Sequence, residues 1–256
     1  MTKALSEKIV VITGVGGGIG NTFLHHLKDK CKSIISSSRS SLAEVLGDHD
    51  SVEHHEHISL DLTSEQNVKK LFENIRNNYG TLDVFINTIG GSLYSHRLED
   101  FPLEEFKEVL DVNLTSAFLL TKEAIHLMKE GGGNIVHIVS SSAKRVSKHK
   151  APYGIAKAGL TRMIHYAASE CGEYDIKING ISPTYVFTSR HERELEKKAK
   201  ILQKTREEIQ EHVIESQLLK KPLYPQDLLS LLELLLSTDI ITGQIYHCTL
   251  GEVLSY

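Results

Sequence analysis

The sequence contains little cysteine and no tryptophan, and neither sign of charge dominates it. Cys31, Cys171 and Cys248 are its three cysteines, and they lie far apart without a CxxC spacing. This pattern indicates neither a disulfide framework nor a zinc ligand set, so we interpret the three as reduced thiols. The 29 basic and 33 acidic residues give a net charge of −4. That balance disfavours a nucleic-acid-binding protein, although it leaves room for a local basic patch.

Long apolar runs are also missing. The most apolar segment, residues 228–236, is interrupted by Glu233 and is far shorter than the ~20 residues that cross a bilayer. The N-terminal MTKALSEKIV has no apolar stretch of the length found in a signal peptide. We therefore expect a soluble, cytoplasmic protein with no membrane partner.

Short runs rich in Val and Ile alternate with longer amphipathic segments. We expect strands at 9–13, 33–37, 56–60, 84–87, 134–139, 177–181 and 244–248, and the main helices at 65–78, 102–129 and 151–172. This alternation predicts an α/β fold, a Rossmann-type doubly wound parallel sheet of about seven strands with helices on both faces. The 256 residues show no repeat and no Pro/Gly/Ser-rich linker, so we expect a single domain over 1–256.

Residues 190–221 differ in composition from the rest of the chain. They are densely charged, with both signs mixed, and have helical propensity. Their place after the sixth expected strand puts them at the carboxyl edge of the sheet, where open α/β sheets bind ligands. We therefore expect residues 184–221 to form a helical substrate lid. The alternative is a solvated pair of surface helices.

A glycine cluster follows the first expected strand. Gly14, Gly18 and Gly20 fit the spacing TGxxxGxG, whereas the GxGxxG pattern counted from Gly14 would need a glycine at Ile19. Glycines suit a sharp turn whose backbone N–H groups approach a pyrophosphate at the start of a helix. The position after a first strand favours a dinucleotide site over an ordinary strand–helix turn.

The end of the second strand bears on the choice of cofactor. Arg39 stands among serines there, and no carboxylate follows before Glu44. A carboxylate would bond the ribose 2′-hydroxyl of NAD, whereas an arginine accommodates the 2′-phosphate of NADP. The sequence thus favours NADP, with NAD as the alternative if Arg39 is only a solvated loop residue.

Tyr153 and Lys157 are four residues apart at the start of an expected helix, so both side chains share one face. A nearby ammonium stabilises a phenolate and lowers the phenol pKa, which suits general acid–base work. Ser140 lies thirteen residues before Tyr153, at the end of the fifth expected strand. Its hydroxyl could hold a carbonyl oxygen beside the tyrosine.

These features together resemble the classical short-chain dehydrogenase/reductase family over nearly the whole chain. The resemblance rests on TGVGGGIG from Thr13, DLT from Asp61, LDVFIN ending at Asn87, VN ending at Asn113, Ser140, YGIAK from Tyr153, NGISP ending at Pro183, and ITGQ at 241–244. Three departures are Thr88-Ile89-Gly90 after the fourth strand, Thr184 in place of a glycine after Pro183, and Cys248-Thr249-Leu250-Gly251 where a motif rich in Asp, Asn and Gly is usual.

The resemblance implies roles for the matching positions. Tyr153 would donate the proton in carbonyl reduction or remove it in alcohol oxidation, and Ser140 would orient the carbonyl. Lys157 would lower the tyrosine pKa and hold the nicotinamide ribose, while Asn113 would position a water in a proton relay. The cofactor contacts implied are Gly14, Gly18, Ile19, Gly20, Arg39, Asp61 (to adenine), Leu62, Asn87, Tyr153, Lys157, Pro183, Val186 and Thr188 (to the carboxamide).

The implied activity is an NADP(H)-dependent oxidoreductase that interconverts a carbonyl and a secondary alcohol of a small molecule. A 3-oxoacyl-type or other ketone reductase fits this description. The alternatives are a sugar or polyol dehydrogenase of the same family and a noncatalytic NADP-binding regulator. The resemblance also implies a homotetramer or dimer.

Two clusters of titratable residues lie outside the motifs named above, one of histidines and one of cationic side chains. His49, His54, His55 and His57 are dense enough to bind metal, but HExxH is absent, and we expect no metal site. The second cluster lies between Ser140 and Tyr153, where cations could attract an anionic substrate unless the loop is merely solvated. Its members are Lys144, Arg145, Lys148, His149 and Lys150.

Overall fold

The computed structural model describes residues 3–46 and 54–254, and its centre is one parallel sheet of seven strands. The strand order is β3-β2-β1-β4-β5-β6-β7, so the chain winds outward from β1 in one direction and from β4 in the other. The predicted Rossmann-type sheet is thus confirmed. The strands are β1 Ile9–Thr13, β2 Ser33–Ser38, β3 His55–Ser59, β4 Val84–Asn87, β5 Gly133–Ile138, β6 Ile176–Pro183 and β7 Ile245–Cys248.

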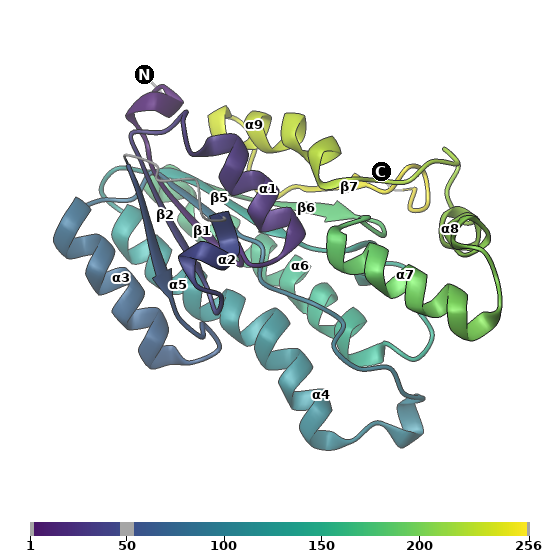
Figure 1. Cartoon of the computed structure of the whole chain (residues 1–256). Helices are drawn as coiled ribbons and strands as arrows, with labels where there is room; N and C mark the ends of the chain where they lie inside the picture. The colour runs from purple at the N-terminus through teal and green to yellow at the C-terminus, as the bar shows by residue number, and fades with distance from the viewer. Residues whose placement is uncertain (1–2, 47–53, 255–256) are drawn as a thin grey trace.

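Helices cover both faces of the sheet (Figure 1). One apolar core joins the sheet to α3, α5 and α6, and a second joins it to α1 and α9. The described α-helices are α1 Gly18–Leu27, α2 Leu42–Leu46, α3 Glu65–Tyr79, α4 Leu103–Leu110, α5 Ser116–Met128, α6 Ala151–Cys171, α7 Ser189–Leu202, α8 Arg206–Ile214 and α9 Leu229–Ser237. In this described part of the chain, no helix has the length and apolarity that crossing a membrane requires.

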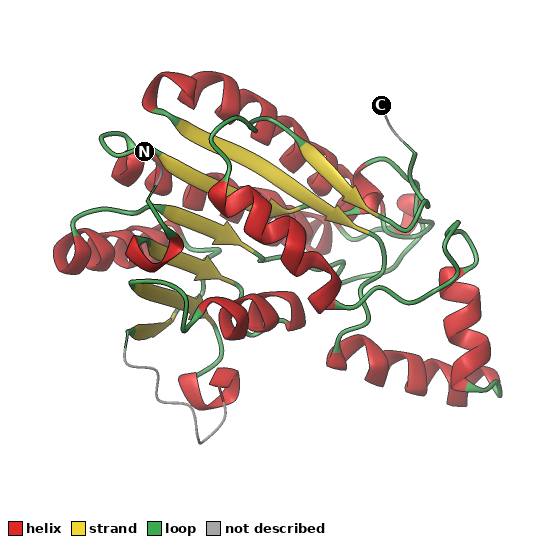
Figure 2. Cartoon of the chain, turned by 90° about the horizontal axis from the view of Figure 1, so that it is seen from above, coloured by secondary structure: helices red, strands yellow, loops and turns green. Residues whose placement is uncertain are grey.

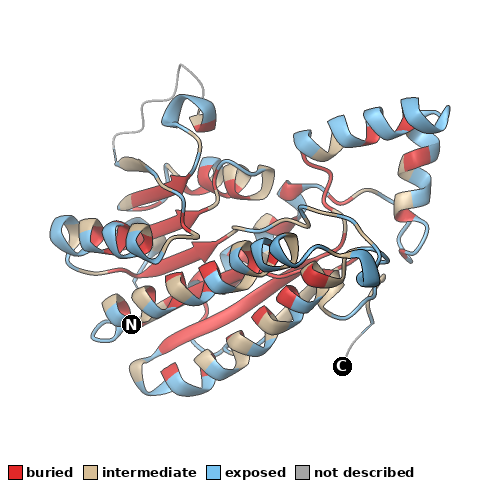
Figure 3. Ribbon diagram, turned by 90° about the horizontal axis from the view of Figure 1, so that it is seen from below, coloured by how far each residue is buried: buried red, intermediate tan, exposed pale blue. Residues whose placement is uncertain are grey.

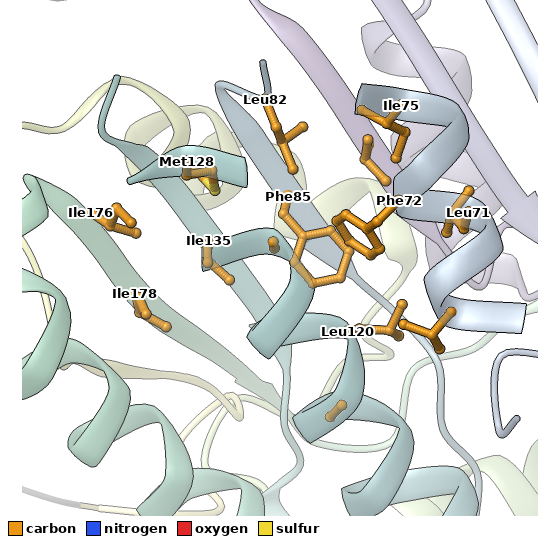
Figure 4. Close-up of a cluster of buried hydrophobic side chains, with 14 of the residues drawn as sticks. Leu71, Phe72, Ile75, Leu82, Phe85, Leu120, Met128, Ile135, Ile176 and Ile178 are labelled. Carbon is orange, nitrogen blue, oxygen red and sulfur yellow. The ribbon is translucent and has the colours of Figure 1, made fainter. Parts of the chain in front are cut away.

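The central strands are buried on both sides, which explains their continuous apolar runs. All five residues of β1 and all eight of β6 are buried (Figure 3). In the core under α3 and α5, the rings of Phe72 and Phe85 meet edge to face with centroids 6.1 Å apart (Figure 4). This contact packs α3 against β4.

The helix expected over 102–129 is interrupted by a π-helical turn at Asp111–Thr115, between α4 and α5. The turn surrounds Asn113, whose side-chain Nδ2 donates to the backbone oxygens of Val109 and Gly91 at 2.9 Å each. Single π turns inside helices are frequent at functional sites. Here the extra residue turns the Asn113 side chain toward the loop that follows β4.

Helices α7 and α8 occupy most of residues 184–221 and stand apart from the layered body, beyond the carboxyl ends of the strands (Figure 2). They share a small core of their own, formed by Phe187, Leu195, Ala199, Ile209 and Ile214. The hydroxyls of Thr188 and Thr205 cap the two helices. These helices therefore extend the sheet edge toward which β4, β5 and β6 point.

Candidate active site

The glycine turn between β1 and α1 forms a close-packed cradle. Gly14 has a φ of +86°, which favours glycine, and its amide donates to the Ser37 oxygen at 2.8 Å. Helix α1 starts at Gly18, so the unpaired amides of its first turn, including those of Ile19 and Gly20, lie at this turn. Such amides suit an anionic group, and the turn therefore fits a dinucleotide pyrophosphate.

Thr88, one of the departures from the family pattern, fills the space under this turn. Its hydroxyl donates to the Thr13 oxygen at 2.8 Å. A Cβ added at Gly14 or Gly20 would lie 2.6 or 2.4 Å from that hydroxyl oxygen. On the outer side of the turn, a Cβ at Gly18 would lie 2.6 Å from the Thr188 Cβ. The glycines are therefore required by packing on both sides of the turn.

The end of β2 places hydroxyls and Arg39 beside the same turn. A Cβ at Gly16 would lie 3.0 Å from the Ser40 Oγ, and Arg39 is exposed. Glu44 is engaged elsewhere, because its carboxylate accepts from the Ser41 amide at 2.7 Å and from the Ser41 hydroxyl at 3.1 Å. The described surroundings thus bring a guanidinium and hydroxyls, rather than a free carboxylate, to this edge.

The Asp61 carboxylate lies close to the same edge. It accepts from the Thr63 amide and hydroxyl, at 3.1 and 2.8 Å, and these bonds together with the charge of Arg39 lower its pKa. Leu62 is buried in the core, so it can offer a cofactor only its backbone. Of these two predicted cofactor residues, Asp61 alone presents a side chain.

Tyr153 and Ser140 meet at the carboxyl end of the sheet. The Ser140 hydroxyl lies close enough to the Tyr153 phenol to influence its pKa. Burial raises the pKa of Tyr153, and the Ser140 hydroxyl opposes that rise. The Ser140 oxygen also accepts from the Ser142 amide at 3.2 Å, which orients the hydroxyl. The two groups are thus close enough to act on one oxygen atom.

Lys157 lies behind the tyrosine and is 2% exposed. Its Nζ donates to the Ile138 oxygen at 2.9 Å and lies 5.8 Å from the centre of the Tyr153 ring. Burial lowers the pKa of Lys157 to about 8. The lowering of the Tyr153 pKa that the spacing predicts is not found in this state, because burial of the phenol outweighs other effects.

Gly90 allows Asn113 and Lys157 to approach each other. A Cβ at Gly90 would lie 2.8 Å from both the Asn113 Oδ1 and the Lys157 Nζ. The Asn113 Oδ1 accepts from the Gly91 amide at 3.0 Å. All four predicted catalytic residues are therefore gathered around the ends of β4 and β5.

A buried polar row runs beneath these residues. Thr13 donates to the Asn87 Oδ1 at 2.9 Å, and the Asn87 Nδ2 lies 3.4 Å from the His137 Nδ1. The His137 Nε2 lies 3.1 Å from the Thr121 hydroxyl. Burial, and after it the charge of Lys157, lowers the pKa of His137 to about 3. Asn87 is one of the residues predicted from the sequence, whereas His137 is not, because in the sequence it is a single polar residue inside the apolar run 135–139.

The predicted residues after β6 lie beside the start of α7. Pro183 ends β6 opposite Cys248 on β7, and Val186 bridges to Leu223 and is buried. The Thr188 hydroxyl accepts from the His191 amide at 3.4 Å and lies 3.0 Å from the His191 Nδ1. Thr188 and Val186 therefore connect the edge of the glycine turn to the start of α7.

Both charged clusters make contacts within the protein. Arg145 is paired with Glu252 at 2.5 Å, so its charge is compensated inside the protein. His55 and His57 flank the Ser36 hydroxyl at 2.7 and 2.8 Å. His49 lies outside the described residues, and within the described ones no three His, Cys, Asp or Glu side chains form a group that could hold a metal ion.

Comparison with known proteins finds extensive similarity. A family model described as enoyl-(acyl carrier protein) reductase matches residues 14–251. A D-beta-hydroxybutyrate dehydrogenase from Rhizobium meliloti is 30% identical over 222 residues, 83% of each chain. The structure of a sorbitol-6-phosphate 2-dehydrogenase from Erwinia amylovora has a TM-score of 0.87 at 25% identity and covers 96% of this chain and all of its own. A short chain dehydrogenase from Leptospira borgpetersenii with bound NAD+ has a TM-score of 0.84 at 26% identity, over 98% and 94% of the two chains.

Proposed function

Because the chain belongs to the short-chain dehydrogenase/reductase family, whose members are oxidoreductases of alcohols and ketones, we propose that it interconverts a small-molecule carbonyl and a secondary alcohol with NADP(H). One observation carries the proposal: the Ser140 hydroxyl lies beside the Tyr153 phenol, and the buried Lys157 Nζ is 5.8 Å from the centre of the Tyr153 ring. A noncatalytic regulator would need none of this arrangement.

The roles of the chain's residues follow from that geometry. NADPH supplies the hydride when it is bound. Ser140 holds the carbonyl oxygen, and the Tyr153 phenol delivers the proton to that oxygen during reduction and removes it during oxidation. Lys157, with a pKa of about 8, is mostly charged at neutral pH and favours the phenolate that Tyr153 becomes when it gives up its proton.

The preference for NADP is supported by the end of β2. Arg39 and the hydroxyls of Ser38 and Ser40 offer a cation and donors to a 2′-phosphate. The Ser40 backbone oxygen accepts from the Ser59 hydroxyl at 3.2 Å and lies 2.8 Å from the His57 Nε2, so β3 anchors this turn. The glycine turn, Asp61 and Thr188 would hold the rest of the dinucleotide.

The substrate is expected to enter between the loop after Ser140 and the helical segment 184–221. Lys144, Lys148 and Lys150 remain available to an anionic substrate there, whereas Arg145 does not. A sugar or polyol is the second candidate substrate. It is favoured by the likeness to the sorbitol-6-phosphate dehydrogenase.

A substrate screen tests the proposal. Purified protein is mixed with NADPH and 3-oxo esters, diketones or ketoses, and with NADP+ and polyols, while the reduced cofactor is followed by absorbance. We expect turnover with at least one carbonyl compound and higher kcat/KM with NADPH than with NADH. Cofactor binding without turnover of any compound would support the noncatalytic alternative.

The homotetramer or dimer implied by the family resemblance stays a prediction. Phe118 on α5, and Ile155 and Tyr166 on α6, are more than half exposed although large and apolar, as a face covered by a second copy would be. Analytical ultracentrifugation of the purified chain would determine the number of copies.

A further inference from the structure

Glu252, in the turn after β7, is a carboxylate almost completely removed from solvent. Its side chain is 3% exposed. The Oε1 accepts from the Arg145 Nη1 at 2.5 Å and from the Ser216 hydroxyl at 2.6 Å. The Oε2 accepts from the Thr184 hydroxyl at 2.5 Å, and the nearby Ser141 hydroxyl also lowers the pKa of the carboxyl.

Burial alone would raise the pKa of the Glu252 carboxyl. The hydrogen bonds from Ser216 and Thr184 and the charge of Arg145 outweigh it and hold that pKa below its ordinary value. The carboxylate is therefore charged at neutral pH and bound by strong, charge-assisted donors.

The donors come from three segments, one of which begins at Ser140. Ser141 and Arg145 belong to the turn that begins at Ser140, Thr184 directly follows β6, and Ser216 lies just after α8. The catalytic Ser140 is bonded into the same turn, since its backbone oxygen accepts from the Ala143 amide at 3.0 Å. A shift of the Glu252 carboxylate would thus move the residue next to Ser140.

The backbone around Glu252 strengthens the same connection. The Leu250 oxygen accepts from the amides of Leu218 and Leu219 at 2.9 and 3.0 Å. Gly251 has a φ of +84°, and a Cβ there would lie 2.6 Å from the Leu218 Cβ. The turn at 250–252 is therefore pressed against the segment that follows α8, at the end of residues 184–221 that returns to the sheet.

We propose that Glu252 is a positioning residue for the reaction: its carboxylate ties the Ser140 turn, the end of β6 and the lid together and thereby fixes the Ser140 hydroxyl against Tyr153. The proposal rests on the function proposed above. It also gives a reason for Thr184, because the glycine that the family carries at this position could not donate to Glu252. Because small displacements of catalytic groups cost up to ~100-fold in rate, loss of this connection should appear in kcat.

Glu252→Gln tests the proposal, with Glu130→Gln on the exposed turn after α5 as the matched control. Glutamine keeps the size but replaces one acceptor oxygen by a donor, so it cannot accept from Arg145, Ser216 and Thr184 together. We expect kcat for ethyl acetoacetate reduction, per folded molecule, to fall ~10- to 100-fold with NADPH affinity unchanged. We also expect faster hydrogen exchange at the amides of Ala143 and Leu218, and none of these changes in Glu130→Gln.

A purely structural role would lower the melting temperature and leave kcat per folded molecule unchanged, and that result would overturn the proposal. Unchanged amide exchange would overturn it too. Should Glu252→Gln fail to fold, Arg145→Gln, at an exposed side chain, takes its place with the same expected direction in kcat and exchange. If the unmodified protein reduces no compound of the screen, the proposed function fails, while amide exchange alone still decides whether Glu252 holds the three segments.

Discussion

Acid should destabilise this protein because His137 is buried as a neutral imidazole. The side chain is 0% exposed, and burial, followed by the charge of Lys157, lowers its pKa from 6.5 to about 3. The unfolded chain, with an ordinary histidine pKa, binds a proton below pH 6.5 that the folded chain does not bind. The contribution of His137 is therefore complete above pH 6.5 and is lost progressively as pH falls from 6.5 toward 3.

The size of the effect follows from the two pKa values. Each pH unit below 6.5 costs about 1.4 kcal/mol of unfolding free energy, so pH 5 costs about 2 kcal/mol. In His137→Gln the amide replaces the imidazole between Asn87 and Thr121 and does not titrate. We therefore expect the unmodified protein to lose about 2 kcal/mol more than this variant between pH 7 and pH 5.

Urea unfolding of both proteins at the two pH values measures this difference, and any pH-independent cost of the smaller side chain cancels in the comparison. His212→Gln, at a histidine whose side chain is 73% exposed, is the control and should lose stability in parallel with the unmodified protein. Parallel loss by His137→Gln as well would refute the reasoning.

Three further predictions concern the cofactor and residues 184–221. Arg39→Ala should weaken NADPH binding by roughly 10- to 100-fold and leave NADH binding nearly unchanged, as measured by fluorescence titration; equal losses for both would contradict the phosphate role. Gly20→Ala puts a Cβ 2.4 Å from the Thr88 hydroxyl oxygen. It should lower the unfolding free energy by about 1–3 kcal/mol and abolish dinucleotide binding. Gly172→Ala is the control and should be tolerated, because a Cβ at Gly172 has no atom within 4 Å. Gln217 is 0% exposed, and both polar atoms of its side chain have no hydrogen-bond partner among the described residues. Gln217→Met should therefore raise the melting temperature. A lower melting temperature would show that the Gln217 amide has hydrogen-bond partners in the folded protein.

Much of the fold was predictable because the strands are buried on both faces and therefore appear as short Val/Ile runs. The predicted ranges differ from the observed strands only at their ends, as at β3, which runs one residue earlier than expected. The interruption at Asp111–Thr115 was not predictable. The Asn113 side chain at this interruption bonds to the backbone oxygens of Gly91 and Val109. Gly91 lies outside the helix, in the loop after β4, so the helical pattern of 102–129 contains no sign of this contact.

Some residues of the candidate site were likewise predictable from the sequence, and others were not. Gly14, Ser140, Tyr153 and Lys157 could be found from local spacing, because each acts within a turn or a helix. The pairing of Arg145 with Glu252 joins residues 107 positions apart, so nothing in the local pattern separates Arg145 from its lysine neighbours. The one available signal was Thr184, a departure from the family pattern whose hydroxyl needs a partner.

The proton role of Tyr153 is tested most directly by Tyr153→Phe, which removes the phenolic hydroxyl and keeps the ring. NADPH affinity and melting temperature are measured together with turnover of the best carbonyl substrate. We expect unchanged affinity and folding and a loss of kcat of about 10²- to 10⁴-fold, as for removal of a general acid. Turnover close to that of the unmodified protein, with NADPH bound equally well, would contradict the proposed mechanism.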